Sequence, residues 1–111
     1  MCVIVDEKRT DTPERLEQSH NIDAFLAGID GPKILCGDFN LLPDTQSLRL
    51  LERDMVNLIR AYRISSTRTR YYTLPDKYAD YVLVSEDIQV MDFQAMDAVV
   101  SDHKPLLLTF A

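Results

Sequence analysis

The sequence has no apolar run that approaches the roughly 18 residues of a membrane-spanning helix, and it opens with no positively charged and then apolar leader. Positive charge is also scarce, because 12 Lys and Arg stand against 18 Asp and Glu and give a formal net charge of −6. A surface for polyanions needs clustered cations and is opposed by negative net charge. We therefore expect no membrane span and no general nucleic-acid surface, so any affinity for nucleic acid has to be local.

Cysteine is rare as well, and repeats, low-complexity tracts and linkers are absent. The two cysteines, Cys2 and Cys36, are far apart in the sequence, and Cys36 ends an apolar segment, where a free thiol usually packs as a small hydrophobe. This cysteine usage predicts a reduced, cytoplasmic protein. With 111 residues, 46% of them hydrophobic and 27% charged, the composition is that of one globular domain over residues 1–111.

Two segments have helical spacing. The first lies within residues 10–32, where Thr12 can cap the helix, Pro13 occupies its first position and Gly28 lies near its end. Its core-facing stripe is predicted at Leu16, Ser19, Ile22, Phe25 or Leu26, and Ile29. The second helix has one apolar stripe, formed by Leu48, Leu51, Met55, Leu58, Ile59 and Tyr62.

The remaining apolar segments predict strands. A short buried strand is expected at Lys33–Cys36, followed by a turn over Gly37–Pro43. Beyond the second helix, four short segments are rich in Val, Tyr, Phe and Leu: TRYYTL, DYVLVS, IQVMDFQAM and KPLLLTF. With a further strand at Val3–Val5, the order becomes βαβαββββ. It predicts an α/β (α+β) fold in which one mixed β-sheet carries two helices on one face.

Polar side chains follow or precede three of these strands. Asp38 and Asn40 come directly after the first buried strand, Asp80 begins DYVLVS, and Asp102 and His103 precede the last strand. Taken singly, an acid after a glycine is more often a turn residue, and a lone histidine is more often structural. Together, polar groups at the ends of several strands indicate one site at one end of the sheet.

Three motifs carry a family resemblance: ILCGDFN, ADYVLVS and VSDHKPLLL. In this order, each at a strand end, they resemble the endonuclease/exonuclease/phosphatase superfamily. The resemblance implies a DNase I-like fold, a four-layer α/β sandwich, of which this chain matches the C-terminal half. The other half of the family domain carries a metal-binding glutamate, an asparagine and a further His or Tyr, and the segment MCVIVDEKR contains no motif that replaces them.

The resemblance also implies a role for each polar residue of the motifs. Asp38 would position or activate the attacking water, and Asn40 would donate to the phosphoryl oxygen. Asp80 would hold the imidazole of His103, which would contact the scissile phosphate. Asp102, with Asp38, would reach a Mg²⁺ or Mn²⁺ ion. The chemistry agrees, since hydrolysis of a phosphoester needs a hard cation on the phosphoryl oxygens, and a carboxylate both fixes the tautomer of an imidazole and favours its charged form.

Three further polar features of the sequence have a structural explanation beside a functional one. The arginine-rich segment RAYRISSTRTRYY can be a local phosphate clamp, although a solvated connection is favoured by the acidic composition, and the resemblance places Thr67 and Arg68 near the substrate groove. Ser101, Asp102 and His103 spell a hydrolase triad, but consecutive residues on a strand point to opposite faces and cannot form one. His20, on the first helix, is expected to be solvated.

Three functions remain open: half of a metal-dependent phosphoesterase acting on a phosphoester, possibly nucleic acid; a non-catalytic module for interaction or oligomerisation; and a minimal enzyme, active alone or as a homodimer. The half-domain interpretation also predicts a weakly active or inactive chain. The strand segments Ile34–Cys36, Tyr81–Val84 and Leu106–Leu108 lack polar breaks, which is typical of strands buried on both faces. Two helices can cover only one face, so a two-fold homodimer through the uncovered sheet face is predicted.

Overall fold

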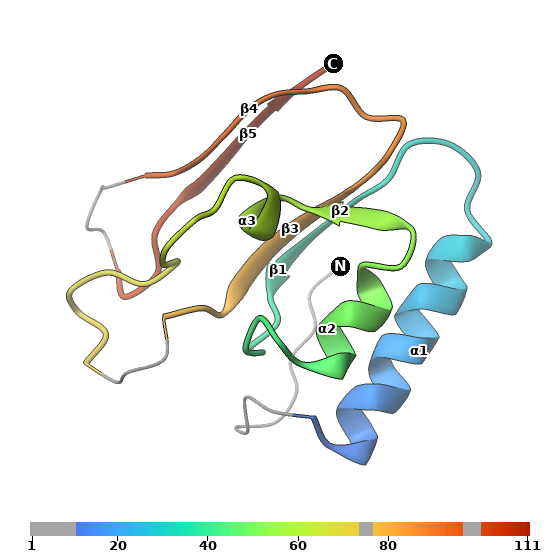
Figure 1. Cartoon of the computed structure of the whole chain (residues 1–111), viewed down its shortest axis with the longest axis horizontal. Helices are drawn as coiled ribbons and strands as arrows, with labels where there is room; N and C mark the ends of the chain where they lie inside the picture. The colour runs from blue at the N-terminus through green and yellow to red at the C-terminus, as the bar shows by residue number, and fades with distance from the viewer. Residues whose placement is uncertain (1–10, 74–76, 97–100) are drawn as a thin grey trace.

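The computed structural model describes residues 11–73, 77–96 and 101–111 (Figure 1). In chain order its elements are α1 (Pro13–Ala27), β1 (Ile34–Asp38), α2 (Gln46–Leu51), β2 (Met55–Asn57), α3 (Leu58–Ala61), β3 (Asp80–Ser85), β4 (Val90–Ala95) and β5 (Leu106–Phe110). The predicted combination of helices and strands in one α/β fold is confirmed. The predicted strand at Val3–Val5 lies outside the described residues.

Helix α1 begins and ends as the sequence predicts. The hydroxyl oxygen of Thr12 accepts a hydrogen bond from the Arg15 backbone N–H at 3.2 Å, Pro13 occupies the first helical position, and Gly28 caps the C-terminus. The buried stripe is Arg15, Ser19 and Ile22. Ser19 and Ile22 are buried as predicted, whereas Arg15 was not predicted; its side chain reaches into the turn after β1. Of the other predicted positions, Leu16 and Leu26 are partly buried, and Phe25 and Ile29 are exposed.

The predicted single second helix is wrong, because three elements occupy its place. Helix α2 ends at Leu51, the strand β2 follows, and α3 is one short turn. Met55–Asn57 pairs with β3, so its backbone bonds are made across the sheet instead of along a helix. The Asn57 side chain then accepts from the Ile59 N–H at 3.1 Å and starts α3 as its N-cap.

The strands form two antiparallel sheets where one mixed sheet was predicted. The first has the order β1-β3-β2, and the second pairs β4 with β5. Each ladder among the described strands is antiparallel, since the connections bring neighbouring strands back in opposite directions. The predicted strand TRYYTL does not form within residues 69–73, because this segment turns on itself and bonds the loop before β5 through Thr69 N–H and the Asp102 carbonyl, 3.0 Å apart.

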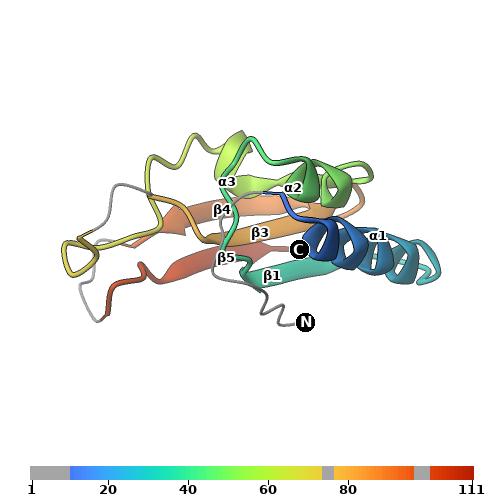
Figure 2. The ribbon, with the colours of Figure 1, turned by 90° about the horizontal axis from the view of Figure 1, so that it is seen from below.

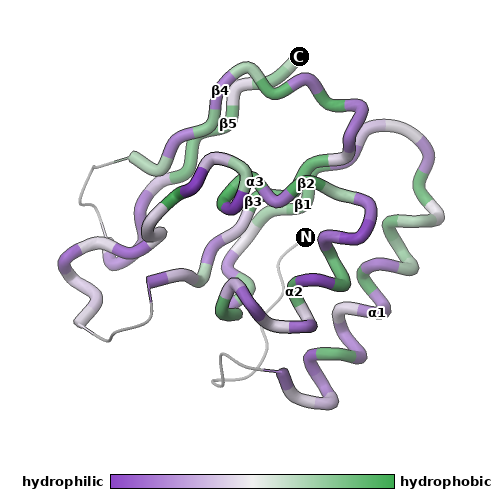
Figure 3. The backbone as a smooth tube through the Cα atoms, in the orientation of Figure 1, coloured by the Kyte–Doolittle hydropathy of each residue, from purple (hydrophilic) through white to green (hydrophobic). Residues whose placement is uncertain are grey.

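The core lies between the strands and the helices. Figure 2 shows α2 and α3 on one side of the strands, with α1 beside α2, and Figure 3 shows hydrophobic residues gathered around α2, α3 and β2. In β3, Tyr81–Val84 is buried as predicted, and Ser85 is buried as well. In β1 and β5, alternate side chains are exposed, including 39% of Ile34 and 49% of Leu107, so the expected burial on both faces fails there. No helix of the described segments is long and apolar enough to cross a membrane.

Asp11 links the start of α1 to the start of α2. Its carboxylate accepts hydrogen bonds from the N–H of Gln46 at 2.9 Å and from the N–H and hydroxyl of Ser47, both at 2.7 Å. Partial burial alone would raise the pKa of Asp11, but these hydrogen bonds outweigh it and hold the pKa below its ordinary value of 3.8. The two helices are therefore joined by one carboxylate.

We expect Asp11→Ala to lower the free energy of unfolding by about 1 to 2 kcal/mol at pH 7, because the first turn of α2 loses its acceptors. Glu17→Ala, an exposed acid of α1, should change it by less than about 0.5 kcal/mol. A lowered folded-state pKa gives stability that is present above the unfolded value and lost as the pH falls through the folded value. Urea unfolding should therefore show the difference between the protein and Asp11→Ala shrinking below about pH 4; a difference that is constant down to pH 2 would contradict this.

Candidate active site

The turn after β1 leaves Asp38 exposed and Asn40 partly exposed, while Phe39 between them is buried. Phe39 is 2% exposed and stacks on Tyr81, with ring centroids 5.7 Å apart. Gly37 has a φ of 150° and Asn40 a φ of 50°, conformations that glycine and asparagine tolerate best. The Asp38 carboxylate accepts from the Asn40 N–H at 3.0 Å, so the turn holds Asp38 at the surface.

The backbone of this turn is anchored from two sides. The carbonyl of Ala79, just before β3, accepts the N–H of Phe39 at 2.8 Å and that of Asn40 at 3.2 Å. From the other side, the buried guanidinium of Arg15 donates to the Phe39 carbonyl at 3.0 Å. The turn is therefore fixed to the start of β3 and to α1 at once.

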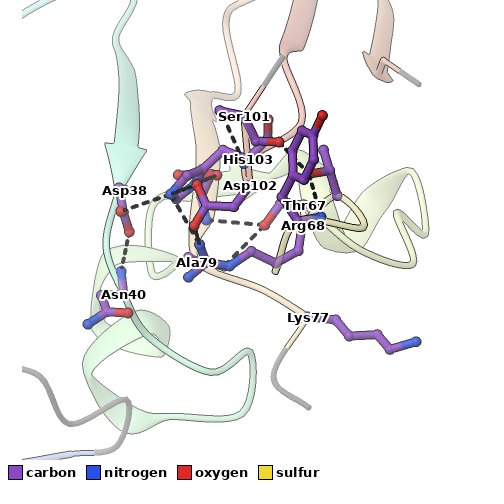
Figure 4. A network of polar contacts seen from close by, with 12 residues as sticks. Asp38, Asn40, Thr67, Arg68, Lys77, Ala79, Ser101, Asp102 and His103 are labelled. Atoms are coloured by element: carbon purple, nitrogen blue, oxygen red, sulfur yellow. Dashed lines mark hydrogen bonds and ion pairs between the residues drawn. The ribbon is translucent and has the colours of Figure 1, made fainter. Parts of the chain in front are cut away.

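Sheet register brings the acids together, and the loop before β5 adds the histidine. Asp38 pairs directly with Asp80 across β1 and β3. An isolated bridge joins Arg68 to His103, and the ring Nδ1 of His103 lies 2.6 Å from a carboxylate oxygen of Asp80 (Figure 4). The predicted contact between Asp80 and His103 is confirmed.

The partners of His103 fix its tautomer. The guanidinium of Arg68 lies 3.1 Å from His103 Nε2, and arginine can only donate hydrogen bonds. In this arrangement Nε2 accepts, so the single ring proton is on Nδ1, where it is donated to Asp80. This is the tautomer that satisfies both contacts at once, and sequence reasoning did not anticipate a guanidinium on the second nitrogen.

Two exposed carboxylates flank the half-buried pair of Asp80 and His103. An oxygen of Asp38 lies 3.8 Å from His103 Nε2, and Asp102 lies 3.7 Å both from that nitrogen and from the Arg68 guanidinium. The side chains of Asp38 and Asp102 are 48% and 47% exposed, against 15% for Asp80. Burial raises the pKa of Asp80 above its ordinary value, and the Asp38 charge adds to this, while the hydrogen bond and charge of His103 act in the opposite direction.

The donor atoms suit a divalent cation. Ligand atoms of Asp38, Asp80 and His103 lie within 4.8 Å of one another, close enough for one ion to reach all three. Carboxylate oxygens are the ligands that Mg²⁺ and Mn²⁺ prefer. This group shares Asp38 with the set predicted from the sequence, whose other member, Asp102, stands beside His103.

The other predicted residues occupy three different positions. Asn40 joins the site through its backbone, and in Figure 4 its side chain lies beyond Asp38, away from His103. Arg68 is at the centre, with its side chain 7% exposed and its guanidinium 4.0 Å above the Tyr72 ring. Thr67 is fully buried, so its side chain bonds the protein backbone and offers no surface to a substrate.

The structure gives no catalytic contact to Ser101 or to His20 among the described residues. The Ser101 hydroxyl bonds the backbone N–H and carbonyl of His103 at 3.0 and 3.2 Å, which is a turn contact and not a relay to the ring. His20 lies exposed on α1. Sequence reasoning missed the anchors Arg15 and Ala79; the spacing of Arg15, Ser19 and Ile22 was a usable signal, since it places an arginine on a buried helical stripe.

Comparison with known proteins finds one matching family and two curated relatives. A family model described as the Endonuclease/Exonuclease/phosphatase family matches residues 2–103. Two UPF0294 proteins of Vibrio vulnificus, from strains YJ016 and CMCP6, are each 31% identical over 99 residues, which cover 87% of this chain and 34% of each relative. The chain thus spans about a third of the length of these curated relatives.

Two solved structures share the fold. A mannosyl-6-phosphatase of Bacteroides thetaiotaomicron VPI-5482 superposes with a TM-score of 0.73 at 17% identity, over 95% of this chain and 48% of that one. An endonuclease/exonuclease/phosphatase family protein of Bacteroides thetaiotaomicron gives a TM-score of 0.69 at 18% identity, over 86% and 43%. Each match covers about half of the larger protein.

Replacing Asp80 with a neutral residue tests whether its buried charge costs the fold stability. We expect Asp80→Asn to leave the free energy of unfolding at pH 7 unchanged or to raise it by up to about 1 kcal/mol, because a neutral amide avoids the cost of burying a charge. A raised folded-state pKa means that ionisation costs stability, so the gain should appear only as the pH rises above 3.8 and through the folded value.

Urea unfolding from pH 3 to 8 measures the effect of Asp80→Asn, with the exposed Asp54→Asn as the matched control. A loss of more than about 1 kcal/mol at pH 7 would show that the contact with His103 outweighs the cost of burial.

Proposed function

This chain belongs to the endonuclease/exonuclease/phosphatase family, and from this premise we propose that it forms the part of a metal-dependent phosphoesterase that acts on the scissile phosphate. One observation carries the proposal: Asp80, His103 and Arg68 form a connected hydrogen-bonded row flanked by the exposed acids Asp38 and Asp102. The structural neighbour named as a mannosyl-6-phosphatase supports phosphoester hydrolysis as the reaction class.

Each side chain has a role that follows from its contacts. Asp38 is exposed and ionisable, so it can orient or deprotonate the attacking water. Asp80 accepts the Nδ1 proton of His103 and thereby keeps Nε2 directed toward the exposed side of the site, where the phosphate would lie. Asp38 and Asp102 would hold Mg²⁺ or Mn²⁺, which supplies charge stabilisation on the phosphoryl oxygens when bound.

Arg68 is the cation of the site. Its guanidinium is almost wholly buried, its Nε has no hydrogen-bond partner among the described residues, and it already contacts His103 Nε2. A phosphate oxygen is a stronger acceptor for a guanidinium than a neutral imidazole, because the bond is charge-assisted. We therefore assign Arg68 to the phosphoryl oxygens; the donor role that the family resemblance implies for Asn40 would need its side chain to turn toward His103.

The substrate class is a phosphoester, and nucleic acid is one member of it. Of the arginines in RAYRISSTRTRYY, Arg68 belongs to the site and Arg70 follows it in the same loop, 5.6 Å from the Tyr71 ring centre, whereas Arg60 is paired with Glu52. This local positive charge favours an anionic substrate approaching from the 66–72 loop.

We expect this chain alone to hydrolyse a phosphodiester or phosphomonoester weakly or not at all with Mg²⁺ or Mn²⁺, and a version extended upstream in its reading frame to be active, because two exposed carboxylates hold such ions loosely. In the active form, His103→Ala or Asp38→Ala should reduce kcat/KM by at least about 10³-fold. His20→Ala, an exposed histidine of α1, is the matched control. Activity that survives both Asp38→Ala and EDTA would refute the proposal.

A second candidate, an oligomerisation module, is favoured by the outer sheet face. Ile34, Val84 and Val56 are cross-strand partners and share one face of the sheet; the two outer members, Ile34 and Val56, are 39% and 37% exposed, whereas Val84 between them is buried at 2%. Figure 2 shows none of the described helices on this side of β1. We propose that a second copy of the chain packs there, because a two-fold axis makes such a face complementary to itself.

Light scattering after size-exclusion chromatography should then give twice the chain mass of 12.7 kDa at micromolar concentration. Ile34→Glu should shift the protein to the monomer, since a charge in an interface above about 1,000 Å² stays desolvated. Phe25→Glu, at an exposed apolar position of α1, should leave the mass unchanged. A soluble monomer before any substitution would reject the dimer and leave the catalytic proposal untouched.

A further inference from the structure

Thr67 lies where three segments of the site meet. Its side chain is fully buried, and its hydroxyl oxygen accepts the N–H of Ala79 at 3.1 Å and that of Asp80 at 3.4 Å. Its backbone N–H donates to the Lys77 carbonyl at 2.9 Å, and its carbonyl accepts the Lys104 N–H at 2.8 Å. One residue therefore contacts both the start of β3 and the loop that carries the histidine (Figure 4).

Ala79 connects Thr67 to the turn after β1 through its two backbone groups. Its N–H is held by Thr67, and its carbonyl accepts the N–H groups of Phe39 and Asn40. Ala79 is 0% exposed, so neither of its backbone groups can exchange its partner for solvent without opening the structure. A displacement of the peptide between Ala79 and Asp80 would move the acids on both strands.

We propose that Thr67 is the positioning residue of this site. Its hydroxyl oxygen sets the peptide before Asp80, so that the Asp80 carboxylate meets Nδ1 of His103 at 2.6 Å, and its carbonyl sets Lys104, the neighbour of His103. Thr67 touches no substrate and is not a catalytic residue. The effect on activity rests on the proposed function, whereas the effect on geometry does not.

Two substitutions separate the oxygen from the bulk of the side chain. Thr67→Ser keeps the hydroxyl oxygen and removes a methyl group. Thr67→Val keeps the branched shape and removes the oxygen, which leaves the buried N–H groups of Ala79 and Asp80 without their acceptor. If Thr67 only fills space, Thr67→Ser is the worse variant; if it positions the site, Thr67→Val is.

The readout is the Nδ1 proton of His103, observed by NMR at one fixed pH. A proton in a short hydrogen bond to a carboxylate exchanges slowly and resonates downfield, and His20→Gln identifies which histidine the signal belongs to. We expect the signal in the unaltered chain and in Thr67→Ser, and its loss in Thr67→Val while the amide signals of Val82, Leu83 and Val84 persist. A folded Thr67→Val that keeps the signal overturns the proposal.

If Thr67→Val does not fold, hydrogen exchange of the unaltered chain tests whether Thr67 holds the Ala79 amide. The Ala79 amide should be protected as strongly as the Leu83 amide at the centre of β3, although Ala79 lies outside the ladder. Exchange of the Ala79 amide at the rate of an unstructured peptide would overturn the proposal. In an active form, Thr67→Val should lower kcat about 10- to 100-fold with KM unchanged, and Thr67→Ser should restore it. An inactive protein with both NMR results intact would reject the proposed function alone.

Discussion

The antiparallel pairing of β1 with β3 is the constraint on which the rest of the site depends. It places Leu35 opposite Leu83 and Asp38 opposite Asp80, so the same register that aligns the core also aligns the acids. Because side chains alternate along a strand, a shift of one residue would turn both the core side chains and the acids to the wrong face. Selection for a packed core and selection for the site therefore act on the same ladder.

Electrostatics explains why the site combines three carboxylates with one guanidinium. Asp38, Asp80 and Asp102 repel one another, and the most buried of them, Asp80, is the one that shares a proton with His103. Arg68, whose guanidinium stacks on Tyr72, provides a positive charge that offsets part of this repulsion. The negative charge that remains on the two exposed acids is the part that a divalent cation would neutralise.

Sequence patterns predicted the parts of the fold that local chemistry decides. Helix α1, with its threonine cap and N1 proline, and strand β3, with its unbroken apolar run, appear where the patterns place them. The second helix failed because Val56 and its neighbours gain more from pairing with β3 than from continuing a helix, and this choice is made by tertiary contacts. The motifs located the acids and His103, but not Arg15 and Ala79, because a buried arginine has no motif and a backbone carbonyl has no side-chain signature.

The position of Asp80 shows what the site costs the fold. Its folded-state pKa is raised, so at neutral pH its charge opposes folding, and β3 tolerates it at the end of a strand that is otherwise fully buried. The same partial burial limits the access of water to the Asp80 carboxylate, which strengthens its hydrogen bond with His103. A fold selected for stability alone would place a neutral residue at position 80. The carboxylate is consistent with selection for the orientation of the histidine, and the hydrogen bonds of Thr67 to the backbone at Ala79 and Asp80 supply the rigidity that such an orientation requires.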